Sequence, residues 1–186
     1  MIKYLSDFRL KRYRNQALQK LGRNLYNFGL VERWLKFIVT VSDVTIFGTK
    51  SGPMLDSKTK RKTEKTQRMM LGQLINEIFE LWNPEATSSD SQLQLFDISL
   101  KTSMKIEMSL ESYQQLKNSY EVMLSDRNFL IHQFNEKFPL YTIESCSEAI
   151  ASLDEMREKH LPAIHHLQET VKTFLELSKD LQSSLE

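Results

Sequence analysis

The chain has 186 residues, and its 25 Lys and Arg side chains nearly balance its 24 Asp and Glu side chains. This length and balance fit most simply one globular domain with a single hydrophobic core. No apolar run approaches the ~20 residues that a membrane helix needs. The N-terminus also lacks the apolar segment of a secretion signal. The lone cysteine, Cys146, excludes an internal disulfide and fits a reducing cytoplasm. Together these features predict a cytoplasmic protein with no membrane contact.

The near-neutral total hides an uneven distribution of charge. Residues 1–23 carry seven Lys or Arg side chains against Asp7 alone, and residues 50–68 carry seven more against two acids. From Glu144 onward, nine carboxylates outnumber four Lys and Arg side chains. The basic regions suit a nucleic-acid backbone or the acidic surface of a partner protein. For either cluster alone, a solvated polar face is the simpler interpretation.

Apolar residues recur at helical spacing through most of the chain. The first run predicts a long helix that begins near residue 8 or 15 and ends in the low forties. Glu32 falls on its apolar stripe, and we expect it to pair with Lys36, one turn later, rather than with Arg127. Residues 37–47 are rich in β-branched side chains and fit either a strand or a buried helix end.

The middle of the chain contains shorter predicted elements. Gly52-Pro53 and the surrounding lysines predict a mobile basic loop over residues 48–66. A helix over about residues 66–82 follows, and Asn83-Pro84 ends it. Polar and apolar residues then alternate with a period of two, which predicts a small β-hairpin inserted near residues 92–108.

Helical spacing returns in the last part of the chain. It predicts a helix over about residues 109–124 that leads, continuously or through a kink, into the next segment. Residues 145–148 have the spacing of a capping box and predict the start of another helix. Pro162 either kinks this helix or begins a new one. The expected fold class is mainly α, a bundle of about five helices in one domain over residues 1–186.

Residues 125–134, Ser-Asp-Arg-Asn-Phe-Leu-Ile-His-Gln-Phe, combine a cation with a titratable imidazole. Ser125 or Asp126 is suited to cap a helix there. Arg127 and His132 would then lie near a helix start, where unpaired N–H groups favour a phosphate. Residues five apart on a helix diverge by about 140°. Two subunits facing each other would therefore bring this pair together more easily than one helix.

Other residue patterns offer less chemistry. His160, His165 and His166 are spaced onto different helix faces, so we expect surface or helix-edge positions and no metal site. Cys146 lies at a predicted helix start, where a thiol pKa can fall, but no histidine base is near it in sequence. Residues 48–51 lack the first glycine and the spacer of a phosphate loop. We expect neither a metal nor a cofactor.

The motif Arg127-Asn128-Phe129-Leu130-Ile131-His132 resembles the Arg-polar-x3-His form of the R-x(4–6)-H signature of HEPN domains. Residues 21–28, leading into 32–36, are similar to the first long helix of many bacterial HEPN-like proteins. Leu71-Gly72-Gln73-Leu74 resembles the opening of their second helix. The resemblance covers most of residues 20–180 and is specific at residues 126–134. HEPN domains are small helical bundles, often dimeric, and many are metal-independent ribonucleases of toxin–antitoxin or antiphage systems.

The resemblance implies an endoribonuclease that acts as a homodimer without a metal. His132 would be the general base or acid for attack of the 2′-hydroxyl on the adjacent phosphate, and Arg127 would stabilise the developing charge. Asn128 would hold the phosphate or orient His132, and Asp126 would support the site. The RNA backbone would be held by the basic N-terminal segment 1–20 and the loop 48–66, through Arg12, Arg14, Lys60, Arg61 and Lys62.

One residue departs from the family pattern. HEPN toxins paired with small nucleotidyltransferases have a tyrosine two residues after the histidine, which accepts an inactivating modification. This chain has Phe134 there, so control by that chemistry at that position is excluded. The expected partners are RNA, such as a tRNA or an mRNA, and an antitoxin or other defence protein.

Two alternatives to a nuclease stay open. The first is a HEPN-like bundle that binds protein or RNA without catalysis, with Arg127 as a structural ion-pair residue. The second is a helical scaffold with no tie to the family. Exposure of both Arg127 and His132 would favour the nuclease over the first alternative.

Overall fold

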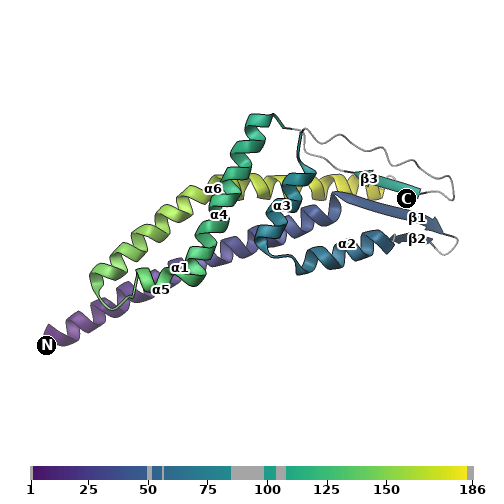
Figure 1. Ribbon diagram of the computed structural model, residues 1–186. Coiled ribbons are helices and arrows are strands. Elements are labelled where there is room, and N and C mark those ends of the chain that lie inside the picture. The colour runs from purple at the N-terminus through teal and green to yellow at the C-terminus, as the bar shows by residue number, and fades with distance from the viewer. Residues whose placement is uncertain (1, 50–51, 56, 85–98, 104–107, 184–186) are drawn as a thin grey trace. The chain divides into compact units, whose positions relative to one another are not determined.

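The computed structural model describes residues 2–49, 52–55, 57–84, 99–103 and 108–183 (Figure 1). Most of these residues are helical, which confirms the mainly α fold class. Over the described residues, no helix has the length and apolar character needed to cross a membrane. The elements, in chain order, are α1 (Ile2–Val41), β1 (Asp43–Thr49), β2 (Gly52–Leu55), α2 (Ser57–Arg68), α3 (Leu71–Leu81), β3 (Ser99–Ser103), α4 (Leu110–His132), α5 (Phe134–Lys137) and α6 (Ile143–Ser183).

The chain divides into two compact units. The first unit consists of residues 1–31 and 119–167, and the second consists of residues 32–118 and 168–186. Helices α1, α4 and α6 each contribute residues to both units. The single domain expected from the sequence therefore stays a prediction.

In the first unit, α1 and α6 run in the same direction (Figure 1). Arg14 Nε donates a hydrogen bond to the Leu140 carbonyl oxygen at 3.0 Å. Ten residues further along α1, Asn24 Nδ2 donates to the Leu153 carbonyl oxygen at 2.8 Å. Residue numbers thus rise together along the two segments. Asn24 is 2% exposed, so its hydrogen bond satisfies a buried polar group that would otherwise destabilise the unit.

A short connection leads the chain from α5 into α6. Leu140 in this connection has a φ of 53°, a left-handed conformation that costs a non-glycine residue about 1–2 kcal/mol. The Thr142 hydroxyl accepts a hydrogen bond from the Ser145 backbone N–H at 3.1 Å. Thr142 therefore caps α6, and the capping box predicted from Ser145 to Glu148 is wrong by three residues.

The spacing of Phe129, Leu130, Phe134 and Phe138 predicts one apolar face in a core, and in the first unit all but the half-buried Phe129 are buried. Leu130, Phe134 and Phe138 are all 5% exposed or less, and the two phenylalanine ring centroids lie 5.4 Å apart. Burial of such side chains stabilises a fold by about 1.5–3 kcal/mol each. This apolar side holds the end of α4 against the rest of the unit.

The second unit contains a three-stranded antiparallel sheet in the order β2-β1-β3. Residues 37–47, which fitted either a strand or a helix end, contain both: α1 ends at Val41 and β1 begins at Asp43. The hairpin predicted near residues 92–108 is wrong where the structure describes it: residues 99–103 form the single strand β3, which pairs with β1, so that Asp43 lies opposite Ser103. Residues 92–98 and 104–107 lie outside the described residues.

The loop predicted over residues 48–66 is wrong. Gly52-Pro53 lies in β2 opposite Gly48 and Thr49 of β1, so these residues form paired strands. The lysine-rich stretch after them forms α2. Lys and Arg have favourable helix propensities, which explains why a run of cations folds as a helix here.

The helix predicted over residues 66–82 is interrupted. Met70 separates α2 from α3, and its backbone N–H is satisfied by Gln73 Oε1 at 3.0 Å. Helix α3 packs on the first half of α4, where the Tyr113 hydroxyl donates to the Phe79 carbonyl oxygen at 2.8 Å. Their rings meet edge to face with centroids 5.5 Å apart.

Candidate functional site at the end of α4

The Arg127–His132 motif forms the last turn and a half of α4, and not the start of a helix. Ser125 and Asp126 lie inside this helix, so the prediction that they cap it is wrong. Interior N–H groups are used by the helix's own hydrogen bonds and do not offer a phosphate site. His132 is instead the last residue of α4, where the negative end of the helix dipole favours a basic side chain.

Both residues of the predicted pair are accessible. The Arg127 side chain is half-buried and the His132 side chain is exposed. Within the described part of the chain, neither makes an ion pair with a carboxylate. Arg127 Nη1 donates a hydrogen bond to Asn128 Oδ1 at 3.1 Å. The guanidinium therefore keeps most of its donors for a ligand.

Asn128 connects the two halves of the motif. Asn128 and His132 are four residues apart, so they share one face of α4, and both are exposed. The hydrogen bond from Arg127 draws its guanidinium toward this face. The length of the arginine side chain and this bond together reduce the divergence of about 140° between Arg127 and His132. Arg127 and Asn128 are thus bonded to each other, and His132 lies one turn further along the face of Asn128.

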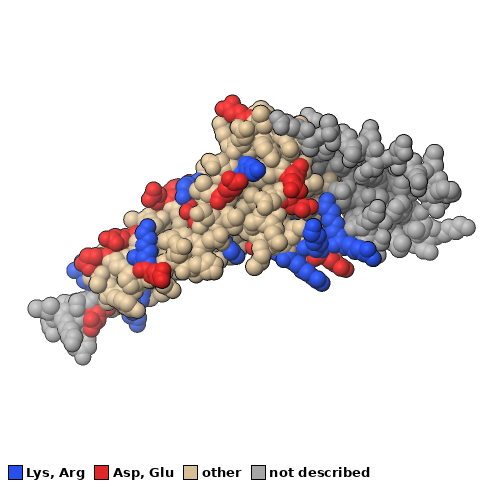
Figure 2. All heavy atoms as spheres, viewed as in Figure 1, with Lys and Arg blue, Asp and Glu red and all other residues tan. Residues whose placement is uncertain are grey.

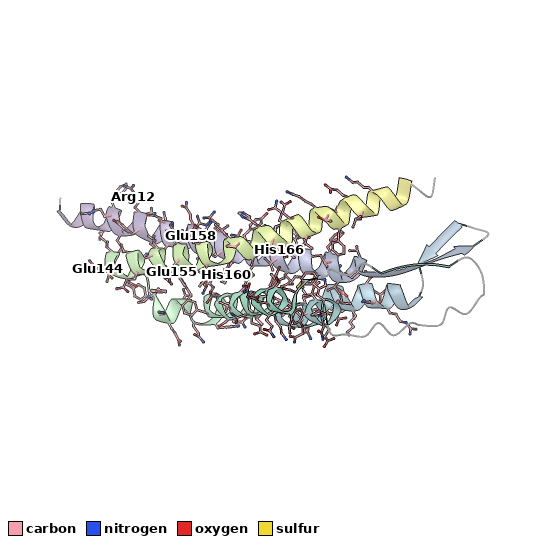
Figure 3. All side chains as sticks on the ribbon, turned by 90° about the horizontal axis from the view of Figure 1, so that it is seen from above. Arg12, Glu144, Glu155, Glu158, His160 and His166 are labelled. Atoms are coloured by element: carbon pink, nitrogen blue, oxygen red, sulfur yellow. The ribbon has the colours of Figure 1, made fainter. Side chains whose placement is uncertain are left out.

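Asp126 contacts α6 on a different side of α4. Its carboxylate lies 2.8 Å from His160 Nε2 and forms an ion pair with Lys159 (His160 is labelled in Figure 3). The His160 ring also meets Phe28 of α1 edge to face, at 5.6 Å between centroids. Asp126 therefore joins the packing of α4 on α6, and any support it gives to Arg127 acts through the position of the helix.

His160 is 3% exposed, so its predicted surface position is wrong. Burial lowers the pKa of His160, and Lys159 lowers it further, whereas the hydrogen bond and charge of Asp126 raise it. His165 and His166 are exposed, as the spacing predicts. In the described residues, no group of three or more His, Cys, Asp or Glu side chains is arranged to hold a metal ion.

Cys146 does not have the environment of a nucleophile. The side chain is fully buried in the first unit. Burial raises the pKa of the Cys146 thiol, and the charge of Arg14 only partly offsets this effect. The sequence pattern suggested the opposite direction. A buried thiol with a raised pKa packs as a small apolar side chain.

The predicted RNA-binding residues have different environments. Arg14 is half-buried and bonded to the Leu140 carbonyl oxygen, whereas Arg12 is exposed and lines a groove on α1. On α2, Arg61 is exposed and Lys62 is half-buried, and the Lys60 side chain lies outside the described residues. Figure 2 shows Lys and Arg side chains gathered over α2.

The groove beside Arg12 contains residues that the sequence did not single out. They include Phe8, which is 70% exposed. Their spacing of three and four residues along α1 was the available signal, because it places them on one helix face. The buried apolar residues of the same helix lie on the opposite face.

Comparison with protein-family models, curated proteins and solved structures gives no match for this chain. A functional assignment therefore depends on the residues themselves. The strongest arrangement is Arg127, Asn128 and His132 at the end of α4.

Proposed function

We propose that the protein is a metal-independent endoribonuclease of the HEPN type, with Arg127 and His132 as its catalytic residues. One observation carries the proposal: both side chains are accessible at the end of one helix, without a carboxylate partner among the described residues. An arginine that only stabilised the fold would be expected to be buried against an acid. The resemblance of residues 127–132 to the HEPN motif indicates which reaction, RNA cleavage, these residues would catalyse.

The reaction is attack of an RNA 2′-oxygen on the adjacent phosphorus. His132 is the general base and accepts the proton of the 2′-hydroxyl. Arg127 donates charge-assisted hydrogen bonds to the non-bridging phosphate oxygens and stabilises their growing negative charge. Asn128 orients the Arg127 guanidinium. The bond to the 5′-oxygen breaks and that oxygen takes up a proton, which leaves a 2′,3′-cyclic phosphate and a 5′-hydroxyl.

The proposed enzyme works in the cytoplasm as a homodimer, within a toxin–antitoxin or antiphage system. Ile131, next to His132, is 46% exposed, and an exposed apolar side chain at the site suits contact with a second copy. In such a dimer, one imidazole accepts the 2′-hydroxyl proton while the other protonates the leaving 5′-oxygen. A partner protein that covers this end of α4 would inhibit cleavage.

The test is cleavage of total RNA and purified tRNA in excess EDTA. The wild type is compared with Arg127→Ala, with His132→Ala and with His165→Ala, a matched control because His165 is another exposed histidine. We expect cleavage by the wild type and the control, and rates lower by about 10²-fold or more for the other two variants. Equal cleavage by all four proteins, or no cleavage by the wild type, would contradict the proposal.

The exposed arginines Arg12 and Arg61 support a second candidate, a HEPN-like module that binds RNA or protein without cutting it. Such a module predicts that RNA binding is lost when these arginines are replaced and is unchanged in His132→Ala. It also predicts no 2′,3′-cyclic phosphate ends after long incubation. The cleavage assay therefore separates the two candidates.

A further inference from the structure

A groove of about 550 Å³ runs along the first turns of α1. The side chains that line it are named here the Phe8 face: Phe8, Lys11, Arg12, Asn15, Gln16 and Gln19. Phe8 and the fully buried Ala17 are nine residues apart, which places them on opposite sides of the helix. The Phe8 face is therefore turned away from the core, and Figure 3 shows Arg12 projecting away from α6.

The cations of the Phe8 face lack the partners that other α1 cations have. Lys20 and Arg23 both pair with Asp154 of α6. Lys11 and Arg12, in contrast, make no ion pair with another residue described by the structure. Among the described side chains that line the groove, none is acidic. Lys11 and Arg12 therefore give this face a positive potential, and Asp7, one turn before Lys11, makes no ion pair with either of them in the described part of the chain.

An exposed aromatic ring stands at one end of this basic face. Phe8 is 70% exposed, so it contributes little to the core of the unit. Aromatic rings beside cations are typical of sites for single-stranded nucleic acids, where bases stack on the ring and phosphates contact the cations. The amides of Asn15, Gln16 and Gln19 add donors and acceptors for base edges. A paired duplex keeps its bases stacked inside and cannot use Phe8 in this way.

We infer that the Phe8 face binds single-stranded RNA, with a base stacked on Phe8 and the adjacent phosphates on Lys11 and Arg12. The inference rests on the proposed nuclease in one respect: it identifies single-stranded RNA as the class of substrate that the nuclease cleaves. Binding itself requires neither Arg127 nor His132.

The experiment measures RNA binding by fluorescence anisotropy with the full chain carrying His132→Ala, so that the probe stays intact. The probes are a labelled unstructured oligoribonucleotide and the blunt duplex of the same sequence. We expect the single strand to bind more tightly than the duplex. Adding Phe8→Ala should weaken single-strand binding about tenfold, and Phe8→Trp should preserve it. Tyr141→Ala removes another highly exposed aromatic ring, 77% exposed, and should have no effect.

The salt dependence tests the two cations separately. Each phosphate contact on a single strand contributes about 0.7 to the slope of log affinity against log salt concentration. Adding Lys11→Ala and Arg12→Ala together should therefore reduce this slope by about 1.4. Arg33→Ala, which removes another exposed arginine of α1, should leave the slope unchanged.

The outcomes separate this inference from the nuclease. Unchanged affinity in Phe8→Ala, equal binding of duplex and single strand, or binding of polyglutamate in place of RNA would each overturn the Phe8 face as an RNA site. Cleavage by the wild type would survive any of those results. Conversely, binding through Phe8 without cleavage by the wild type would overturn the nuclease and support the inference.

Discussion

The contact between Asp126 and His160 predicts how firmly α4 is held on α6. The Asp126 side chain is 20% exposed and lies 2.8 Å from a His160 nitrogen that is almost fully buried. Asp126→Ala leaves this nitrogen without its partner, at a cost of about 1–3 kcal/mol. It also removes the ion pair with Lys159, whose side chain is 47% exposed, so this loss adds at most about 1 kcal/mol. We therefore expect a decrease of about 1–4 kcal/mol in the free energy of unfolding.

Two further variants separate the contribution of the hydrogen bond to His160 from that of the ion pair with Lys159. Lys159→Ala removes only the exposed ion pair and should cost less than about 1 kcal/mol. Asp126→Asn keeps an oxygen that can accept the hydrogen bond and removes the charge, so its cost should lie between the other two. Urea denaturation followed by circular dichroism gives each value, and a changed midpoint with an unchanged slope identifies a pure stability effect.

The pH dependence of the same contact has a defined sign. Burial lowers the pKa of His160 in the folded chain below its ordinary value of about 6.5. Below that pH the unfolded chain takes up a proton that the folded chain does not, so stability is lost as the pH falls. The loss from this one group is limited to about 1.36 kcal/mol per pH unit. Asp126→Asn removes the influence that raises the pKa of His160, so stability should continue to fall to a lower pH.

Measurements of unfolding between about pH 5 and 8 test this reasoning. His160→Asn should remove the His160 share of the slope. Two results would refute the contact: Asp126→Ala costing no more than Lys159→Ala, or identical pH dependence in the wild type and Asp126→Asn.

Three other predictions each depend on one local feature of the structure. Leu140 has a φ of 53°, so Leu140→Gly should be more stable than Leu140→Ala by about 1 kcal/mol, and urea denaturation showing the reverse order would contradict the left-handed conformation. The hydrogen bond from Lys20 lowers the pKa of Asp154, so this contact stabilises the fold above about pH 4 and is lost as the pH falls below it. Lys20→Ala should therefore lose less stability on acidification than the wild type, and equal losses would show that the pair contributes nothing. Asn128→Ala releases Arg127 and should slow single-turnover RNA cleavage about tenfold, while Asn128→Asp should slow it more, because a carboxylate repels the phosphate. Unchanged rates in both Asn128 variants would remove that residue from the site.

The helical part of the fold was predictable because its signals are local. The pairing of Glu32 with Lys36, at 2.9 Å, is confirmed and depends only on their spacing of four residues. The loop prediction over residues 48–66 failed because strand pairing is not local. Gly52-Pro53 is typical of a loop in isolation, but it pairs with the strand that begins at Asp43.

The features of the candidate site also differ in whether the local sequence predicts them. Exposure of His132 and burial of Phe134 follow from the position of each residue in the apolar repeat. The cap at Asp126 was predicted from residue preference alone, and the continuous helix from Leu110 overrides it. Burial of His160 had a local signal, because it lies four residues after Met156 and four before Ile164 on the buried stripe of α6. Its contact with Asp126, 34 residues earlier in the chain, had none.

At the end of α4, one face of the helix packs against the rest of the unit, and another face carries side chains of the proposed catalytic site. Asp126 and Leu130 are four residues apart and face α6 and the apolar core, whereas Asn128 and His132, also four apart, are exposed. Successive residues turn by about 100°, so the contact of Asp126 with α6 also sets the direction in which Arg127 leaves the helix. At a pH where the variant stays folded, Asp126→Asn would therefore rotate or loosen the part of α4 that carries Arg127. The substitution changes no residue of the proposed catalytic pair. A fall in RNA cleavage there, with binding at the Phe8 face unchanged, would assign Asp126 as the residue that positions Arg127.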